Sequence, residues 1–268
     1  MAVTVQGTAT VAESSSSTTL SLAVPTGTTV GEMLIMAVAM SDGTAAVPDQ
    51  TGWTSLGKVA SGQQAPSLGL FWRTVDGTEG STISISGLTL GRCTAFCVRT
   101  NGVSTTTPLD VAVTTVAALT GTSVVFPSVT TVTAGARSIA IAGINATNAE
   151  VLEPASDTEL AKHTQGTGRA MTMSAEAFPS AGAIGTRTWT WSTGASVQNA
   201  GVRVILRPAS TAPTTFTASV SMAGAGALTA STSLKGTVTV KNKTVVGLWR
   251  RSGGSAVAVT THTVKTTP

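Results

Sequence analysis

The sequence is poor in the residue types from which most enzyme sites are built. It has no tyrosine and two histidines, and only 10% of its 268 residues are charged, against about 25% in a typical domain. His163 and His262 have no companion at metal-ligand spacing, and no GxSxG, HExxH or phosphate-loop motif occurs. The sequence therefore predicts a protein that is not an enzyme, with no catalytic residues, no metal and no cofactor.

Cysteine is nearly absent as well. Cys93 and Cys97 are four positions apart, which places them on the same side of a strand at a separation of about 13 Å. That distance is too long for a disulfide. We expect both to be small core residues of a chain that folds in a reducing compartment.

Long hydrophobic runs are missing too. The longest, Met33 to Met40, is far shorter than the roughly 18 residues that span a bilayer. The first residues, MAVTV, form neither a basic nor an apolar leader segment. We therefore predict no membrane insertion, and synthesis in a cytoplasm without a signal peptide.

What the sequence does contain is a buried-strand pattern that occurs twice. Gly31 leads into the apolar run that ends at Met40, and Gly135 leads in the same way into a run that ends at Ile144. Short apolar runs bounded by turn residues are typical of strands buried on both faces. No sustained helical spacing of apolar residues separates the two.

Further strands repeat around these two runs in the same order. The first set is Leu20–Pro25, Thr54–Leu56, Leu68–Arg73, Ser81–Ser86 and Ala95–Arg99; the second is Ser123–Pro127, Thr158–Leu160, Ala170–Ala175, Arg187–Ser192 and Val202–Arg207. Repeats of this kind bury their apolar faces against each other. The prediction is an all-β fold: residues 1–208 form a two-sheet, jelly-roll-like β-sandwich made from a pseudo-duplicated five-strand unit.

The composition changes after residue 208. Residues 209–213 are a predicted linker, and residues 214–268 contain alternating runs with too few large apolar side chains to form a core of their own. We expect this segment to be a β-arm or small β-domain that packs on a partner. Trp and Arg are enriched at interfaces. The candidate partner-binding residues of the arm are Lys235, Lys241, Lys243, Trp249, Arg250 and Arg251.

Charge is distributed unevenly along the chain. All 12 acidic residues lie between Glu13 and Glu176, whereas residues 177–268 contain nine basic residues and no acidic one. Nucleic-acid binding is disfavoured because the basic residues are dispersed and lack interleaved aromatic motifs. The pattern favours electrostatic docking of the arm on an acidic neighbour, such as an identical subunit.

The aromatic residues leave two interpretations open. Trp189 and Trp191 alternate with threonine, so both point to the same side of one strand. Exposed, they would form a stacking platform for a glycan; buried, they would belong to the core, which we favour. Trp53 is predicted to pack at the start of a strand. The Asp76–Gly80 segment is predicted to be a turn, with calcium binding as the alternative.

Several of these segments together resemble a known group of proteins. Val30–Val38, Gly52–Leu56, Leu70–Arg73 with Asp76–Glu79, and Thr186–Ser192 resemble tailed-bacteriophage structural proteins, usually described as minor tail proteins of phages that infect actinobacteria. The glycine-rich Ala218–Ser231 is similar to segments common in such proteins. The resemblance covers most of residues 20–231, implies a β-sandwich virion component, and carries over no catalytic residues.

These observations lead to a non-enzymatic virion structural protein. The first hypothesis is a minor tail protein at the tail tip that contributes to assembly and to attachment to a host-surface glycan. The alternatives are a capsid or tail decoration protein attached through the arm, and a carbohydrate-binding module. The expected partners are other virion proteins and identical subunits, with threefold association favoured from the resemblance.

Overall fold

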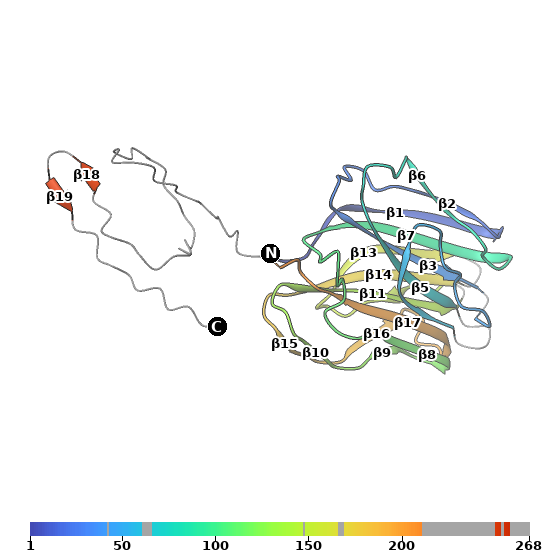
Figure 1. Ribbon diagram of the computed structural model, residues 1–268. Coiled ribbons are helices and arrows are strands. Elements are labelled where there is room, and N and C mark those ends of the chain that lie inside the picture. The colour runs from blue at the N-terminus through green and yellow to red at the C-terminus, as the bar shows by residue number, and fades with distance from the viewer. Residues whose placement is uncertain are drawn as a thin grey trace. The chain divides into compact units, whose positions relative to one another are not determined.

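Every regular element of the described chain is a β-strand, which confirms the predicted all-β class (Figure 1). The structure is a computed structural model that describes residues 1–41, 43–60, 66–146, 148–165, 169–210, 250–252 and 255–257. The chain divides into two units, Met1–Ser210 and Thr211–Pro268. The division falls inside the predicted linker 209–213. No helix of the described residues is long and apolar enough to cross a membrane.

The first half of the body is built on a five-stranded antiparallel sheet in the order β1-β7-β3-β5-β4. A two-stranded sheet, β2-β6, belongs to the same half. The bounds of the five strands are β1 Thr4–Ser17, β7 Gly91–Asn101, β3 Met33–Met40, β5 Ser67–Thr74 and β4 Thr54–Val59. Those of the small sheet are β2 Leu20–Ala23 and β6 Thr82–Ile85.

The second half has a five-stranded antiparallel sheet in the order β13-β14-β11-β17-β8. A three-stranded sheet, β12-β16-β9, and a pair, β10-β15, accompany it. The large-sheet strands are β13 Thr158–Gln165, β14 Arg169–Phe178, β11 Ala136–Asn145, β17 Val197–Leu206 and β8 Thr114–Gly121. The smaller ones are β12 Val151–Leu152, β16 Arg187–Trp191, β9 Val124–Phe126, β10 Val129–Thr131 and β15 Gly182–Ile184.

The central strand β3 is buried along its whole length, as its apolar run predicts. Successive side chains of a strand point to opposite faces, and each face of β3 meets a different core. Met33, Ile35 and Ala37 pack in a core that both large sheets share. Leu34, Met36 and Val38 pack in a second core with β2, β6 and the two cysteines. The predicted burial of Cys93 and Cys97 is confirmed.

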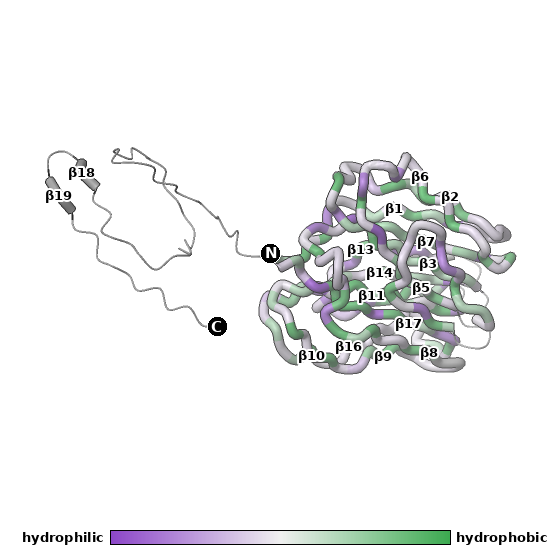
Figure 2. The backbone as a smooth tube through the Cα atoms, viewed as in Figure 1, coloured by the Kyte–Doolittle hydropathy of each residue, from purple (hydrophilic) through white to green (hydrophobic). Residues whose placement is uncertain are grey.

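The two large sheets therefore pack face to face. The shared core contains Phe96 and Val98 of the first sheet and Ile139, Met173 and Val202 of the second. The apolar strands that form it run through the middle of the body (Figure 2). A sandwich of two sheets is thus present, but the body has more layers than the two predicted, because each half also packs a small sheet on the outer face of its large one.

The two large sheets have the same internal order. Reading the second sheet from its β8 edge, β8, β17, β11, β14 and β13 take the places of β1, β7, β3, β5 and β4. The central strands of the two large sheets, β3 and β11, each follow a glycine in a turn. The φ angle is 90° at Gly31 and 83° at Gly135. Glycine adopts these positive angles at low cost, so the predicted glycine turns are confirmed.

Of the second unit the structure describes one antiparallel pair. It consists of β18 (Arg250–Ser252) and β19 (Ser255–Val257). The other residues of the predicted arm lie outside the described part of the chain.

Candidate functional site

Trp189 and Trp191 lie in the interior of the second half. Their relative exposures are 0% and 3%, and they share a core with Phe126 and Val151. The Trp189 ring meets Phe126 edge to face, with centroids 6.1 Å apart, and Trp191 Nε1 donates a hydrogen bond to the carbonyl oxygen of Ala195. The glycan-platform interpretation is wrong, because neither ring has a free face on which a sugar could stack. The core interpretation is confirmed.

The predicted assembly residues of the arm fall mostly outside the described residues. This holds for Lys235, Lys241, Lys243 and Trp249. Arg250 and Arg251 lie in β18, where their backbones pair with Val257 and Ala256. A role of these six residues in partner binding stays a prediction.

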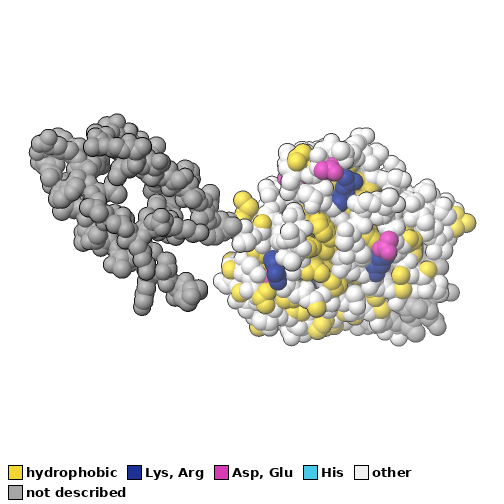
Figure 3. All heavy atoms as spheres, in the orientation of Figure 1, with side chains coloured by type: hydrophobic (Ala, Val, Ile, Leu, Met, Phe, Trp, Pro, Cys, Tyr) yellow, Lys and Arg dark blue, Asp and Glu magenta, His cyan; other side chains and the backbone are white. Residues whose placement is uncertain are grey.

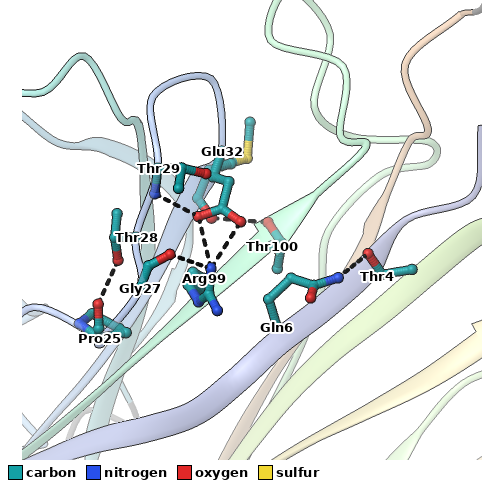
Figure 4. A network of polar contacts seen from close by, with 10 residues as sticks. Thr4, Gln6, Pro25, Gly27, Thr28, Thr29, Glu32, Arg99 and Thr100 are labelled. Atoms are coloured by element: carbon teal, nitrogen blue, oxygen red, sulfur yellow. Dashed lines mark hydrogen bonds and ion pairs between the residues drawn. The ribbon is translucent and has the colours of Figure 1, made fainter.

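Arginine–carboxylate pairs organise the turns of the body. Glu32 and Arg99 form the pair drawn in Figure 4, with Arg99 Nη1 3.1 Å from Glu32 Oε1. The Glu32 carboxylate also accepts a hydrogen bond from the backbone N–H of Thr29, and Arg99 donates to the carbonyl oxygen of Gly27. One ion pair therefore ties the loop before β3 to the strand β7.

The second half contains a comparable pair. Arg187 binds both carboxylate oxygens of Glu176, through Nε at 2.8 Å and Nη2 at 2.6 Å, and the bond with Glu176 raises the pKa of Arg187. Arg203 is buried over the ring of Phe126. On the face shown in Figure 3, basic side chains are few, and most lie against an acidic one. Arg99 and Arg187 therefore each have a carboxylate partner, and Arg203 donates to the carbonyl oxygen of Pro127.

The described residues contain no cluster of potential metal ligands. Within the described ranges, no three His, Cys, Asp or Glu side chains come together as a cation site would require. The Asp76–Gly80 segment forms the predicted turn: Gly77 has a φ of 91°, and Thr78 donates two hydrogen bonds to Asp76 Oδ1. These bonds from Thr78 are the main reason that the pKa of Asp76 is lowered.

A polar pocket lies beside this turn, at the outer sheet of the first half. Its volume is about 340 Å³, within the about 300–1,000 Å³ of small-molecule sites. Trp53 and Arg73 form one part of its wall, and the strand β6 forms another. The lining residues are Leu34, Thr51, Trp53, Arg73, Glu79, Thr82, Ile83, Ser84 and Ser86.

Trp53 and Arg73 are held in place by their neighbours. Arg73 Nη2 donates to Glu79 Oε1 at 3.0 Å, and the guanidinium carbon lies 5.9 Å from the centroid of the Trp53 ring. Glu79 in turn accepts hydrogen bonds from the backbone N–H groups of Asp76 and Gly77. Trp53 is half-buried against the second core, so the predicted packing role is confirmed, while the same residue also lines the pocket.

Sequence reasoning did not identify this pocket. Its members come from three segments that are separated along the chain, and only their placement around the edge of β6 brings them together. The available signal was the combination of a tryptophan, an arginine and a row of alternating hydroxyl residues in turn-rich sequence. That combination is also common in ordinary β-proteins.

Three other concavities occur in the described part of the same unit, and the one beside Arg92 and Arg169, with a volume of about 10 Å³, is too small for a ligand. One of about 520 Å³ lies between the 24–30 segment and the turn at Gly77, and one of about 450 Å³ lies around Asn101–Thr106. These two larger concavities have no aromatic side chain and no basic one in their lining. The Trp53–Arg73 pocket is therefore the candidate site of the described residues.

Comparison with known proteins gives no relative: no protein-family model, no curated protein and no solved structure matches the chain.

Proposed function

We propose that this protein is a non-enzymatic structural component of a tailed-phage virion, in the first instance a minor tail protein. The observation that carries the proposal is the division of the chain into a compact all-β body and a separate basic segment. Virion proteins need a stable body and a means of attachment to neighbouring proteins. The sequence resemblance of residues 20–231 to minor tail proteins points in the same direction.

The body is, in this proposal, a jelly-roll-like unit that was duplicated. Support comes from the common order of the two large sheets and from the glycine turns at Gly31 and Gly135. Each half also packs a small sheet on its large one. Both halves contribute residues to the shared core, as a duplicated unit would.

The basic segment is proposed to attach the body to its partners. The twelve acidic residues of the chain all lie before residue 211, whereas six basic residues and no acidic one follow it. Three of the nine basic residues beyond position 176, Arg187, Arg203 and Arg207, belong to the body. The charge contrast is therefore concentrated in the last unit, and it favours docking on an acidic surface of other virion proteins or of identical subunits, with a trimer as the first expectation.

Localisation and copy number in purified particles test this proposal. Particles are banded from the source culture, labelled with antibody raised against residues 1–210, and the chain is quantified against the major capsid protein. A minor tail protein gives label at one tail end and a few copies per particle. Label over the whole capsid or tail, with a copy number like that of the lattice, would favour a decoration protein. Particles without the chain would refute a virion role.

A further inference from the structure

One edge of β6 is open toward the Trp53–Arg73 pocket. Among the described residues β6 pairs only with β2. The hydrogen bond from Val24 N to Ser81 O shows which residues of β6 direct their peptide groups toward β2. Successive residues direct their peptide groups to opposite edges, so those of Thr82, Ser84 and Ser86 face away from β2. At Ser86 both groups bind the side chain of Gln50, at 2.9 and 3.1 Å. Thr82 and Ser84 therefore present peptide donors and acceptors to the pocket.

The second half shows what closes such an edge. Its strand β16 has the position that β6 has in the first half, and β12 pairs along it through Val151 and Leu152. In the first half no described strand lies along this edge, and the side chain of Gln50 pairs with the backbone of a single residue, Ser86. The open edge at Thr82 and Ser84 is thus a specific difference between two similar layouts, and it leaves room for a ligand.

The walls of the pocket combine an aromatic ring with closely spaced polar groups. Trp53 contributes a half-buried indole ring, the Arg73 guanidinium lies over that ring, and the buried Leu34 and Ile83 line the pocket from the side of the second core. Hydroxyl groups come from Thr51, Thr82, Ser84 and Ser86. A pyranose has the matching chemistry, because its C–H groups pack against the accessible part of an aromatic side chain while its hydroxyls donate and accept hydrogen bonds.

The length of the open edge favours a compact ligand over a peptide strand. The bonds between Gln50 and Ser86 close one end, and Glu79 with its turn closes the other. The edge from Thr82 to Ser84 between them is about 7 Å long, at 3.3 Å per residue. An added β-strand needs a longer edge, whereas a single sugar ring fits this span.

The charges favour an uncharged ligand. Arg73 is neutralised by Glu79, and Asp76 Oδ1 lies 3.9 Å from the same guanidinium. An anionic ligand would therefore meet two carboxylates for one cation. We propose that the Trp53–Arg73 pocket binds one neutral sugar ring of a surface glycan. The sugar site stands on these contacts alone, and its use in host attachment rests on the proposed virion function.

The test is an NMR titration of the full-length protein with single sugars. Glucose, galactose, mannose, arabinose and N-acetylglucosamine are the neutral probes, and glucuronic acid is the anionic one. The expected result is saturable shifts of the Trp53 indole N–H and of the Thr82 and Ser84 amides with at least one neutral sugar. Ser84→Val and Trp53→Phe should each weaken that binding about 3- to 10-fold, as loss of one neutral contact predicts.

Ser21→Val is the matched control. Ser21 lies directly opposite Ser84 in the same small sheet but does not line the pocket, so its substitution should leave sugar binding unchanged. The proposal is overturned if no neutral sugar moves the pocket signals up to its solubility limit, if only glucuronic acid binds, or if the control weakens binding as much as Ser84→Val. Sugar binding by a chain that is absent from particles would refute the virion function and leave this pocket standing.

Discussion

At the scale of single residues, the ion pair of Arg99 and Glu32 is expected to contribute substantially to the stability of the body. The Glu32 side chain is only 7% exposed, and Arg99 is the cation beside it. Arg99→Met keeps most of the side-chain volume but leaves a buried carboxylate without its partner. Breaking such a pair costs about 3–5 kcal/mol, and because Arg99 is partly exposed we expect about 3 kcal/mol in urea unfolding.

Lys162→Met is the comparison for that experiment. Lys162 pairs with Glu159, whose side chain is 42% exposed, and exposed pairs contribute about 0–1 kcal/mol. Equal destabilisation by the two substitutions would contradict the role assigned to Arg99. A Glu32→Gln change in the Arg99→Met background should restore part of the loss, because the buried carboxylate is then removed.

The same scale shows where prediction from sequence ends. The alternation of Trp189 and Trp191 with threonine predicted that both side chains lie on the same side of a strand, but not that this side faces the core. Their burial results from the packing of β16 on the second large sheet. The ion pair of Arg99 and Glu32 was not predicted, since 67 residues separate its members. Contacts between distant side chains depend on the register of strands, which one sequence does not reveal.

At the scale of elements, the two halves differ at β12. The amide of Ser192 donates to the Glu150 carbonyl at 3.0 Å, so by alternation Leu152 and Thr190 form the next hydrogen-bonded pair. Leu152→Pro removes the N–H group that this pair uses, while the exposed side chain contributes little packing. The substitution should destabilise the body by about 1–3 kcal/mol and change the fluorescence of Trp191.

Leu152→Ala separates the backbone effect from the side-chain effect. It keeps the N–H group and should cost less than the proline substitution, with little change in fluorescence. If the two variants unfold at the same urea concentration, the pairing of β12 does not contribute to stability as inferred.

Strands with strong local signals were predictable at this scale. The apolar runs that follow Gly31 and Gly135 form the central strands of the two large sheets. Short elements such as β10, β12 and β15 have no signal of their own, because two or three residues form a strand only where a partner edge is available. For this reason the open edge of β6, and with it the sugar pocket, could not be inferred from the sequence.

At the scale of the whole molecule, the repeated order of strands predicted a common sandwich but not the outer sheets. Both the odd-numbered and the even-numbered positions of β3 are apolar. A strand with two apolar faces must be covered by other elements on both sides. That cover is β2 and β6 in the first half, and β9, β12 and β16 in the second. The need for a cover on both faces could have been predicted from the sequence, whereas the identity of the covering strands could not.

The last unit leads to a prediction about assembly that a comparison of two chains can test. The full-length protein and a chain ending at Ser210 are measured by light scattering in low salt and in about 0.5 M salt, where the Debye length falls to about 4 Å. If the basic unit joins identical subunits, the full-length protein has about three times the 26.7 kDa of one chain, the shorter chain is a folded monomer, and salt dissociates the oligomer. If the full-length protein and the shorter chain are both monomers, the basic unit binds another virion protein instead, because its six basic residues then have no acidic partner among identical copies. An oligomer that persists without residues 211–268 would contradict both outcomes and place the subunit contact on the body.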